Sequence, residues 1–249
     1  MRALGVIPAR LGSTRLPNKP LQLLAGEPLI TRVIERVLDH GLVTELVVAT
    51  DSPRVAEVAR RSSVGSVLTR ESHQSGTERV AEVAGRPEYA VFDVIVNIQG
   101  DEPFISREAM AGALARVEQG DDIGTAAAPL QPALAADPSR VKVVTDAGGR
   151  ALYFSRAVIP HRREANDSSD GLYWQHVGVY AYTPAALRQW VSLPPCPAEQ
   201  AERLEQLRAL HHGLTIGVAR LEDPVLPGVD TADDLRRAEA HWYAFQGQV

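Results

Sequence analysis

The sequence predicts an α/β protein built on a doubly wound, mostly parallel sheet with a β-rich insertion. Short apolar runs alternate with segments of helical periodicity over the N-terminal half of the chain. The run VIVNIQ at residues 94–99 is β-branched and apolar, as in a strand that helices cover on both faces. Helix-start signals such as Ser52 before Pro53 follow the strands. A β-α-β-α-β-α-β order of this kind winds into a parallel sheet.

The elements of this first part are expected in strict alternation. The strands are expected at residues 3–7, 45–49, 66–68 and 94–99. Residues 28–40 carry apolar side chains at helical spacing, and Gly41 ends that helix. A second helix begins at Ser52 and Pro53, a third covers residues 76–84, and Ser106 caps a fourth.

The pattern changes from about Ile123 onward. Strands are expected at residues 141–145, 151–154 and 177–182, with few helices between them. The polar segment 161–172 is expected to be an exposed, mobile loop, and residues 198–211 and 231–245 return to helix. We therefore expect one domain over residues 1–249, with a β-rich insertion at about 125–185.

Composition excludes several classes of protein. The 249 residues carry 26 basic and 31 acidic side chains, and a net charge of −5 argues against a general nucleic-acid binder. No apolar run approaches the ~20 residues that a membrane span needs, and the first residues lack the apolar segment of a secretion signal. A cytoplasmic protein is expected. Cys196 is the only cysteine, which excludes an intrachain disulfide and a cysteine-built metal site.

The basic residues are unevenly chosen and placed. Only Lys19 and Lys142 are lysines, against 24 arginines. Biased codon use explains most of this skew, but such a chain can retain a lysine where a compact ammonium is needed. No acidic residue precedes Glu27, so an acidic protein opens with a cationic segment.

Active sites of parallel α/β sheets lie beyond the carboxyl ends of the strands. The segment after the first expected strand contains the cations Arg10, Arg15 and Lys19, with the small residues Gly12, Ser13 and Thr14 among them. Small residues let backbone N–H groups turn toward an anion, and the cations can neutralise a polyphosphate. The alternative is an exposed basic loop. The segment lacks both the P-loop motif and G-x-G-x-x-G, which disfavours a P-loop NTPase and a dinucleotide-dependent oxidoreductase.

Two acidic positions are candidates for Mg²⁺ ligands. Asp101 follows the strand at 94–99 and is well placed to hold Mg²⁺, unless it only starts a turn, while Gln99 could contact a base or substrate. Asp230 precedes the last helix and could simply cap it, as could Thr231. A second carboxylate that joined Asp101 at one cation would give Asp230 a functional role.

Two further groups of polar residues have both a structural and a functional interpretation. Ser75-x-x-Glu78 fits a helix capping box, but the free N–H groups there also suit a phosphate or base edge, and Arg70, His73 and Gln74 lie beside them. The other group is Arg156, His176, Tyr180, Glu205 and Gln206. Individually these are weak signals, since a histidine on an apolar strand is usually a core residue.

Taken together, the motifs resemble those of the CMP-Kdo synthetases, or 3-deoxy-manno-octulosonate (Kdo) cytidylyltransferases, in order and spacing. The matching segments are IPARLGSTRLPNKPL, VVATD, TRESHQSGTER, VIVNIQGDEP, VKVV, ALYFSRAVIP, HVGVYAY, LEQLRAL and GVDT. The resemblance implies a Rossmann-like fold of the nucleotide-diphospho-sugar transferase type. It also implies transfer of CMP from CTP to the anomeric hydroxyl of Kdo, with Mg²⁺, for lipopolysaccharide biosynthesis. Family members are usually cytoplasmic homodimers, and the β-rich insertion is the expected dimer surface.

The resemblance also assigns roles to residues. Catalysis would use Arg10, Arg15, Lys19 and Asp101. The nucleotide would contact Pro8, Ala9, Arg10, Ser13, Lys19, Arg70, His73, Ser75, Gly76 and Gln99. Mg²⁺ would bind Asp101 and Asp230, and the sugar would contact Arg156, His176, Tyr180, Glu205 and Gln206.

Two alternatives remain open. The same chemistry could act on a related acid sugar, such as 8-amino-Kdo or a nonulosonate, although VKVV, LYFSRAVIP and LEQLRAL favour Kdo over a sialate. A non-catalytic nucleotide-binding protein is disfavoured, because Asp101, Asp230, Arg10 and Lys19 are all present.

Overall fold

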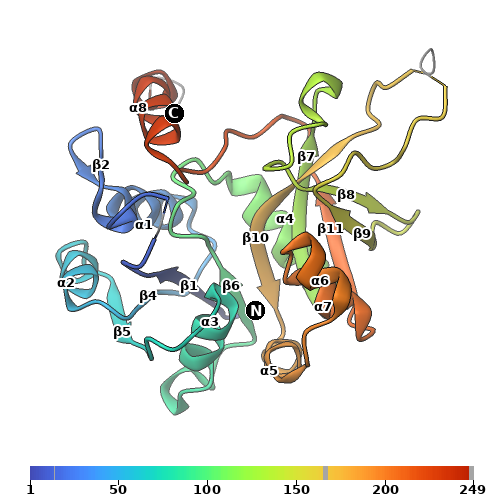
Figure 1. Cartoon of the computed structure of the whole chain (residues 1–249). Coiled ribbons are helices and arrows are strands. Elements are labelled where there is room, and N and C mark those ends of the chain that lie inside the picture. Colours follow the sequence, from blue (N-terminus) through green and yellow to red (C-terminus); the bar gives the residue numbers. More distant parts are fainter. Residues whose placement is uncertain (14, 165–167, 247–249) are drawn as a thin grey trace. The chain divides into compact units, whose positions relative to one another are not determined.

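The structure is a computed structural model that describes residues 1–13, 15–164 and 168–246 (Figure 1). The chain forms two compact units. The first comprises Met1–Ile105 and Leu226–Val249, and the second comprises Ser106–Val225. The β-rich stretch expected at 125–185 lies inside the second unit. That the whole chain acts as one domain stays a prediction.

The first unit contains four parallel strands in the order β6–β1–β4–β5. Their bounds are β1 (Ala3–Ala9), β4 (Glu45–Thr50), β5 (Gly65–Leu68) and β6 (Val94–Asn97). Leu4 in β1 lies opposite Glu45 in β4 and Ile95 in β6. β1 and β6 are almost wholly buried, as expected of strands with both faces covered.

The helices of the first unit begin and end close to the predicted positions. They are α1 (Leu29–His40), α2 (Pro53–Arg61), α3 (Gly76–Ala84) and α8 (Ala232–Gln246), with short 3₁₀ turns η1 (Lys19–Leu21) and η2 (Pro87–Tyr89). Gly41 ends α1 at φ 63°, a left-handed conformation that costs glycine little. A small hairpin of β2 (Leu23–Leu24) and β3 (Glu27–Pro28) precedes α1 and was not predicted.

One hydrophobic cluster of the first unit joins residues far apart in sequence. Its buried members are Leu16, Leu24, Leu29, Phe104, Val229, Ala238 and Trp242. The rings of Phe104 and Trp242 lie 5.8 Å apart, and the guanidinium of Arg32 lies 4.9 Å from the Trp242 ring centroid. The cluster therefore packs α8 against the loops that follow β1 and β6.

The second unit contains β11–β7–β10, in which β11 is parallel and β10 antiparallel to β7. Its strands are β7 (Ile123–Pro129), β8 (Lys142–Thr145), β9 (Ala151–Ser155), β10 (Trp174–Tyr182) and β11 (Ile216–Arg220). β8 and β9 form a hairpin that joins β10 through β8. The helical segments are α4 (Arg107–Glu118), η3 (Pro132–Leu134), α5 (Pro184–Ser192), α6 (Pro197–Glu202) and α7 (Gln206–His211).

The sequence missed β7, β11 and α5, and its single helix over residues 198–211 is wrong. β7 consists largely of glycine and alanine, which carry little strand signal. A Cβ at Gly124 would lie only 1.9 Å from the carbonyl oxygen of Ala113, so close packing of α4 requires the small side chain. Arg203 at φ 53° breaks the predicted helix into α6 and α7.

Two other expectations concern the surface. Residues 161–164 and 168–172 form neither helix nor strand and are mostly exposed, while residues 165–167 of the expected loop lie outside the described residues. None of the helices that the structure describes has the length and apolar character needed to cross a bilayer.

Candidate active site in the first unit

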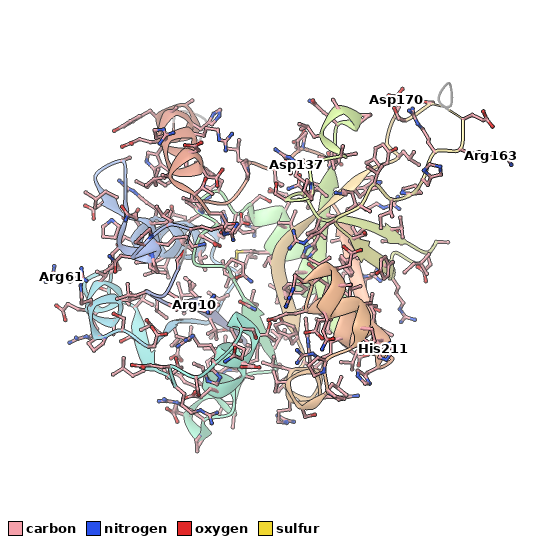
Figure 2. All side chains as sticks on the ribbon, viewed as in Figure 1. Arg10, Arg61, Asp137, Arg163, Asp170 and His211 are labelled. Carbon is pink, nitrogen blue, oxygen red and sulfur yellow. The ribbon has the colours of Figure 1, made fainter. Side chains whose placement is uncertain are left out.

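A cavity of about 300 Å³ opens at the carboxyl ends of the strands in the first unit. Arg10, labelled in Figure 2, follows β1 directly and lines this cavity. The lining residues expected from sequence are Pro8, Ala9, Arg10, Ser13, Arg15, Lys19, Ser75, Gly76, Gln99, Asp101 and Asp230. Thr14 lies outside the described residues. The strand-end rule therefore predicted the part of this lining that follows β1 and β6, which carries Arg10, Lys19 and Asp101.

Two glycines allow these segments to approach one another. A Cβ at Gly100 would lie 2.9 Å from the carbonyl oxygen of Pro8, which is closer than side chains tolerate. A Cβ at Gly76 would lie 3.3 Å from Cγ of Pro8. The end of β1 can therefore pack between the start of α3 and the loop after β6.

The ammonium of Lys19 contacts both candidate metal ligands. Its Nζ donates to a carboxylate oxygen of Asp101 and, at 2.9 Å, to Oδ1 of Asp230. Arg15 also lies 3.0 Å from Oδ1 of Asp230. Burial lowers the pKa of Lys19, but the two carboxylates outweigh this effect and hold the pKa above its ordinary value. The ammonium is therefore charged at any physiological pH.

Backbone and capping contacts position the two carboxylates. The N–H of Val229 donates to the carbonyl of Asp101 at 2.8 Å, which joins the two segments that carry them. The carboxylate of Asp234 accepts from the backbone N–H groups of Asp230 and Thr231, at 3.2 and 2.9 Å, and from the Thr231 hydroxyl. Thr231, rather than Asp230, thus pairs with Asp234 at the start of α8. The Asp230 side chain is left for the cations.

This arrangement fits a divalent cation. One ammonium reaches both Asp101 and Asp230, so the two carboxylates face a single cation position. Carboxylate oxygens are ligands that Mg²⁺ prefers. Within the described residues no group of three or more His, Cys, Asp or Glu side chains is arranged for a metal. Two carboxylates are nevertheless sufficient where substrate phosphates and water supply the other ligands.

Glu102 is a third acid at this position that the sequence analysis did not single out. Burial, and then the neighbouring charges of Asp101 and Asp230, raise its pKa to about 8. A Cβ at Gly228 would lie 2.9 Å from its Oε1, so this glycine leaves room for the carboxyl. The two adjacent acids in the GDEP motif were the available signal.

Ser75 caps α3 as expected, but the return hydrogen bond of a capping box goes to the residue before the cap, Gln74, and not to Ser75 itself. Ser75 accepts from the N–H of Glu78 at 3.2 Å, and Glu78 accepts from the N–H of Gln74 at 2.9 Å. Ser75 and Gly76 also line the cavity, so the same helix start serves both interpretations.

Arg70 and His73 bind a neighbouring carboxylate instead of lining this cavity. Both donate to Oε2 of Glu82 on α3, Arg70 through its backbone N–H and Nε at 3.1 and 3.3 Å, and His73 through Nε2 at 2.5 Å. Hydrogen bonds from His73 and Arg70 outweigh burial and lower the pKa of Glu82. Glu82 therefore fastens residues 70–73 to α3.

Arg79 is a cavity residue that sequence reasoning missed. Its side chain is 2% exposed, and its guanidinium bonds Thr69 and, at 2.9 Å, Oδ2 of Asp51. The available signal was helical spacing, because residues 75, 76 and 79 share one face of a helix.

The expected sugar-binding residues all belong to the second unit. His176, Tyr180 and Glu205 are neighbours: the first two rings lie 5.3 Å apart, and the charge of Glu205 contributes to the raised pKa of Tyr180, whose main cause is burial. Gln206, at the start of α7, is buried. The guanidinium of Arg156 donates to the carbonyls of Glu202 at 2.8 Å and Pro138 at 2.9 Å.

His176 has the contacts of a core residue. Its Nε2 lies 3.0 Å from Oγ1 of Thr125, and its ring meets that of Phe154 edge-on at 5.1 Å. Burial lowers the pKa of His176 to about 4, so the ring is neutral at physiological pH.

Lys142, for which the sequence suggested no role, has a structural one. Its side chain is fully buried, and its ammonium donates to the carbonyls of Asp137, Arg140 and Arg156 at 3.1, 2.6 and 2.6 Å. Burial lowers the pKa of this lysine. It joins the segment before β8 to the end of β9.

The chain is similar to known cytidylyltransferases. The family model for cytidylyltransferases matches residues 4–216. The 3-deoxy-manno-octulosonate cytidylyltransferase of Gemmatimonas aurantiaca is 56% identical over 245 residues, which cover 97% of this chain and 95% of the relative. The chain belongs to the 3-deoxy-manno-octulosonate cytidylyltransferase family. The relative of the same name from Methylococcus capsulatus is 51% identical and covers 95% of each chain.

Solved structures agree with this membership. That of a CMP:2-keto-3-deoxy-manno-octonic acid synthetase complexed with CTP has a TM-score of 0.90 and 39% identity, and covers 98% of this chain and 100% of its own. The 4-diphosphocytidyl-2C-methyl-D-erythritol synthase of Anaerococcus prevotii, at 11% identity and TM-score 0.63 over 97% of this chain and 98% of its own, shares the fold alone. The family and fold expected of this cytidylyltransferase from its motifs are confirmed.

Proposed function

We propose that this protein transfers CMP from CTP to the anomeric hydroxyl of Kdo, giving CMP-Kdo and pyrophosphate for lipopolysaccharide assembly. One observation carries the proposal: the cations Arg10, Arg15 and Lys19 and the carboxylates Asp101 and Asp230 line one cavity at the strand ends. A triphosphate substrate and a divalent cation need this combination of charges.

The chemistry requires charge stabilisation and positioning. The sugar hydroxyl oxygen attacks the α-phosphorus, the bond to the bridging oxygen breaks, pyrophosphate leaves, and the hydroxyl proton passes to water. Negative charge grows on the non-bridging oxygens and on the leaving group. Arg10, Arg15 and Lys19 lie on one loop beside the cavity and can stabilise that charge. Holding both substrates in line supplies much of the remaining rate enhancement.

Asp101 and Asp230 would hold Mg²⁺. When bound there, the ion would neutralise phosphate charge and lower the pKa of the sugar hydroxyl. This chain's own contribution is to fix the two carboxylates through the Val229–Asp101 backbone contact and through Asp234. An Asp101→Ala variant that keeps wild-type turnover at saturating Mg²⁺ would refute this assignment.

The residues that contact the nucleotide and the sugar are also part of this proposal. Pro8, Ala9, Ser13, Ser75, Gly76 and Gln99 line the cavity and are suited to contact the nucleotide, with Arg70 and His73 in the adjoining loop. Tyr180, Glu205 and Gln206 in the second unit would contact the sugar acid. Arg156 and His176 would join them, although their present bonds are to the protein itself.

We also propose a cytoplasmic homodimer. The β8–β9 hairpin exposes Leu152, at 62%, and Tyr153, and an apolar strand face of this kind suits a second copy of the chain. Sedimentation should give twice the mass of one chain, and Leu152→Glu should give a monomer. A monomeric wild-type protein would exclude the dimer. Cytoplasmic location follows from the need for CTP.

One assay tests the reaction. Pyrophosphate release is measured with CTP, UTP, ATP and GTP, each with Kdo, 8-amino-Kdo and a sialic acid. We expect CTP with Kdo to give the highest kcat/KM. Absence of release with CTP and any acid sugar would overturn the function, and a preference for 8-amino-Kdo would assign the alternative substrate.

Lys19→Arg should lower kcat/KM because a bulkier planar cation replaces a compact ammonium.

A further inference from the structure

The cation position between the two candidate metal ligands is held by a group of the chain itself. Lys19 donates to Asp101 and to Asp230, and its side chain is only 17% exposed. Arg15 contacts Asp230 from a more exposed position, at 65%. Two carboxylates thus face two cations, and their charges already balance without a metal.

This contact is built into the loop that carries Lys19. The lysine begins the 3₁₀ turn η1, with Pro20 inside the turn and Asn18 before it at φ 53°. The N–H of Leu21 donates to the carbonyl of Asn18 at 2.8 Å, which closes the turn. A residue held in the left-handed region and a proline both restrict the backbone. The lysine stem therefore starts from a fixed point beside the carboxylates.

We propose that Lys19 is the resident counter-ion of the metal site: its ammonium occupies the position between Asp101 and Asp230 in the free enzyme, and it moves to the triphosphate when CTP enters. This inference rests on the proposed function. Its consequence is that the free enzyme binds divalent cations weakly, and that metal and nucleotide enter together.

The physical reason is competition for the same oxygens. A divalent cation can reach both carboxylates only after the ammonium has left, which breaks two charge-assisted hydrogen bonds in a half-buried place. A triphosphate offers Lys19 and Arg15 new anionic partners, so it lowers the cost of that departure. Binding linkage is reciprocal, and nucleotide and metal must therefore strengthen each other's binding.

The test is metal binding by the protein without nucleotide. Free Mn²⁺ is counted by its EPR signal during titration of wild type, Lys19→Met and Arg10→Met, and Mg²⁺ is then added as competitor. Arg10 lines the same cavity, but the contacts described for the two carboxylates do not include it. We expect Lys19→Met to bind Mn²⁺ at least about tenfold tighter than wild type, and Arg10→Met to remain within about threefold. Lys19→Gln should bind Mn²⁺ as tightly as Lys19→Met. Agreement between the two variants shows that the tighter binding does not come from a folding defect of one of them.

A double variant distinguishes a failure of the proposed metal site from a failure of the counter-ion role of Lys19. Adding Asp101→Asn to Lys19→Met should remove the tight Mn²⁺ binding. If the double variant binds as tightly as Lys19→Met, the proposed metal site is wrong and the inference fails with it. If Asp101→Asn abolishes binding but Lys19→Met binds no tighter than wild type, the metal site stands and the counter-ion role is overturned. Equal tightening by Arg10→Met would also overturn it, because the effect would then be one of net charge.

Discussion

The buried imidazole of His176 should make the second unit sensitive to acid. The Thr125 hydroxyl lies 2.7 Å from the carbonyl of Val179, which can only accept, so the hydroxyl proton belongs to that bond. The oxygen of Thr125 is then free to accept from Nε2–H of His176 at 3.0 Å. These two bonds fix the neutral tautomer, with its proton on Nε2. Acid would have to add a second proton to this ring, and burial disfavours the charged form.

The magnitude follows from the two pKa values. The folded pKa of His176 is about 4 against an ordinary 6.5. Between these values the unfolded chain binds the extra proton and the folded chain does not, so stability falls as the pH falls through this window. From pH 7.5 to pH 4.5 the loss from this one group is about 2.5 kcal/mol.

The assay is urea unfolding of wild type and His176→Gln at several values of pH. Glutamine retains an N–H donor for Thr125 but does not titrate. The wild-type free energy of unfolding should fall more steeply below pH 6.5, and the gap between the two proteins should change by about 2.5 kcal/mol down to pH 4.5. Parallel curves for the two proteins would refute the reasoning, because other titrating groups are common to both.

Two further predictions concern buried groups. Lys142→Met should lower the free energy of unfolding by about 3 kcal/mol, since three carbonyl oxygens lose a charged donor; a loss below about 1 kcal/mol in urea unfolding would contradict this. Trp242→Ala should lower the free energy of unfolding by about 3–5 kcal/mol, because it removes a buried aromatic side chain. It should also raise the Mg²⁺ concentration needed for half-maximal activity, because Trp242 packs on Phe104 in the loop after β6. Tyr243→Ala is the matched control, since Tyr243 is 69% exposed on the same helix, and an equal effect of both variants would contradict the prediction.

The sequence predicted well the features that depend on local chemistry. Apolar runs located β1, β4 and β6, the Ser75–Glu78 spacing located the start of α3, and the strand-end rule brought together Lys19 and Asp101. In each case a short segment carries its own signal. Buried parallel strands and helix caps are recognisable without knowledge of their partners.

The features that were missed depend on distant partners. β7 is a strand because it pairs with β10 and β11, with α4 packed against its small residues, and nothing within its own glycine and alanine run indicates these partners. Arg79 lines the cavity, where Asp51 and Thr69 fix its guanidinium, and three carbonyls from separate segments bind the buried ammonium of Lys142. Arg70 and His73 both contact Glu82 on α3, a partner that their own segment does not reveal.

The chain order of the first unit has a consequence for its biosynthesis. Asp230 and α8 follow the whole second unit in sequence, yet they pack with residues of the first unit around Phe104 and Val229. A ribosome must therefore finish residues 106–225 before it delivers the second carboxylate of the proposed metal site. A nascent chain can form the β6–β1–β4–β5 sheet early, but it has an incomplete charge cluster, with Lys19 facing Asp101 alone, until its last helix emerges.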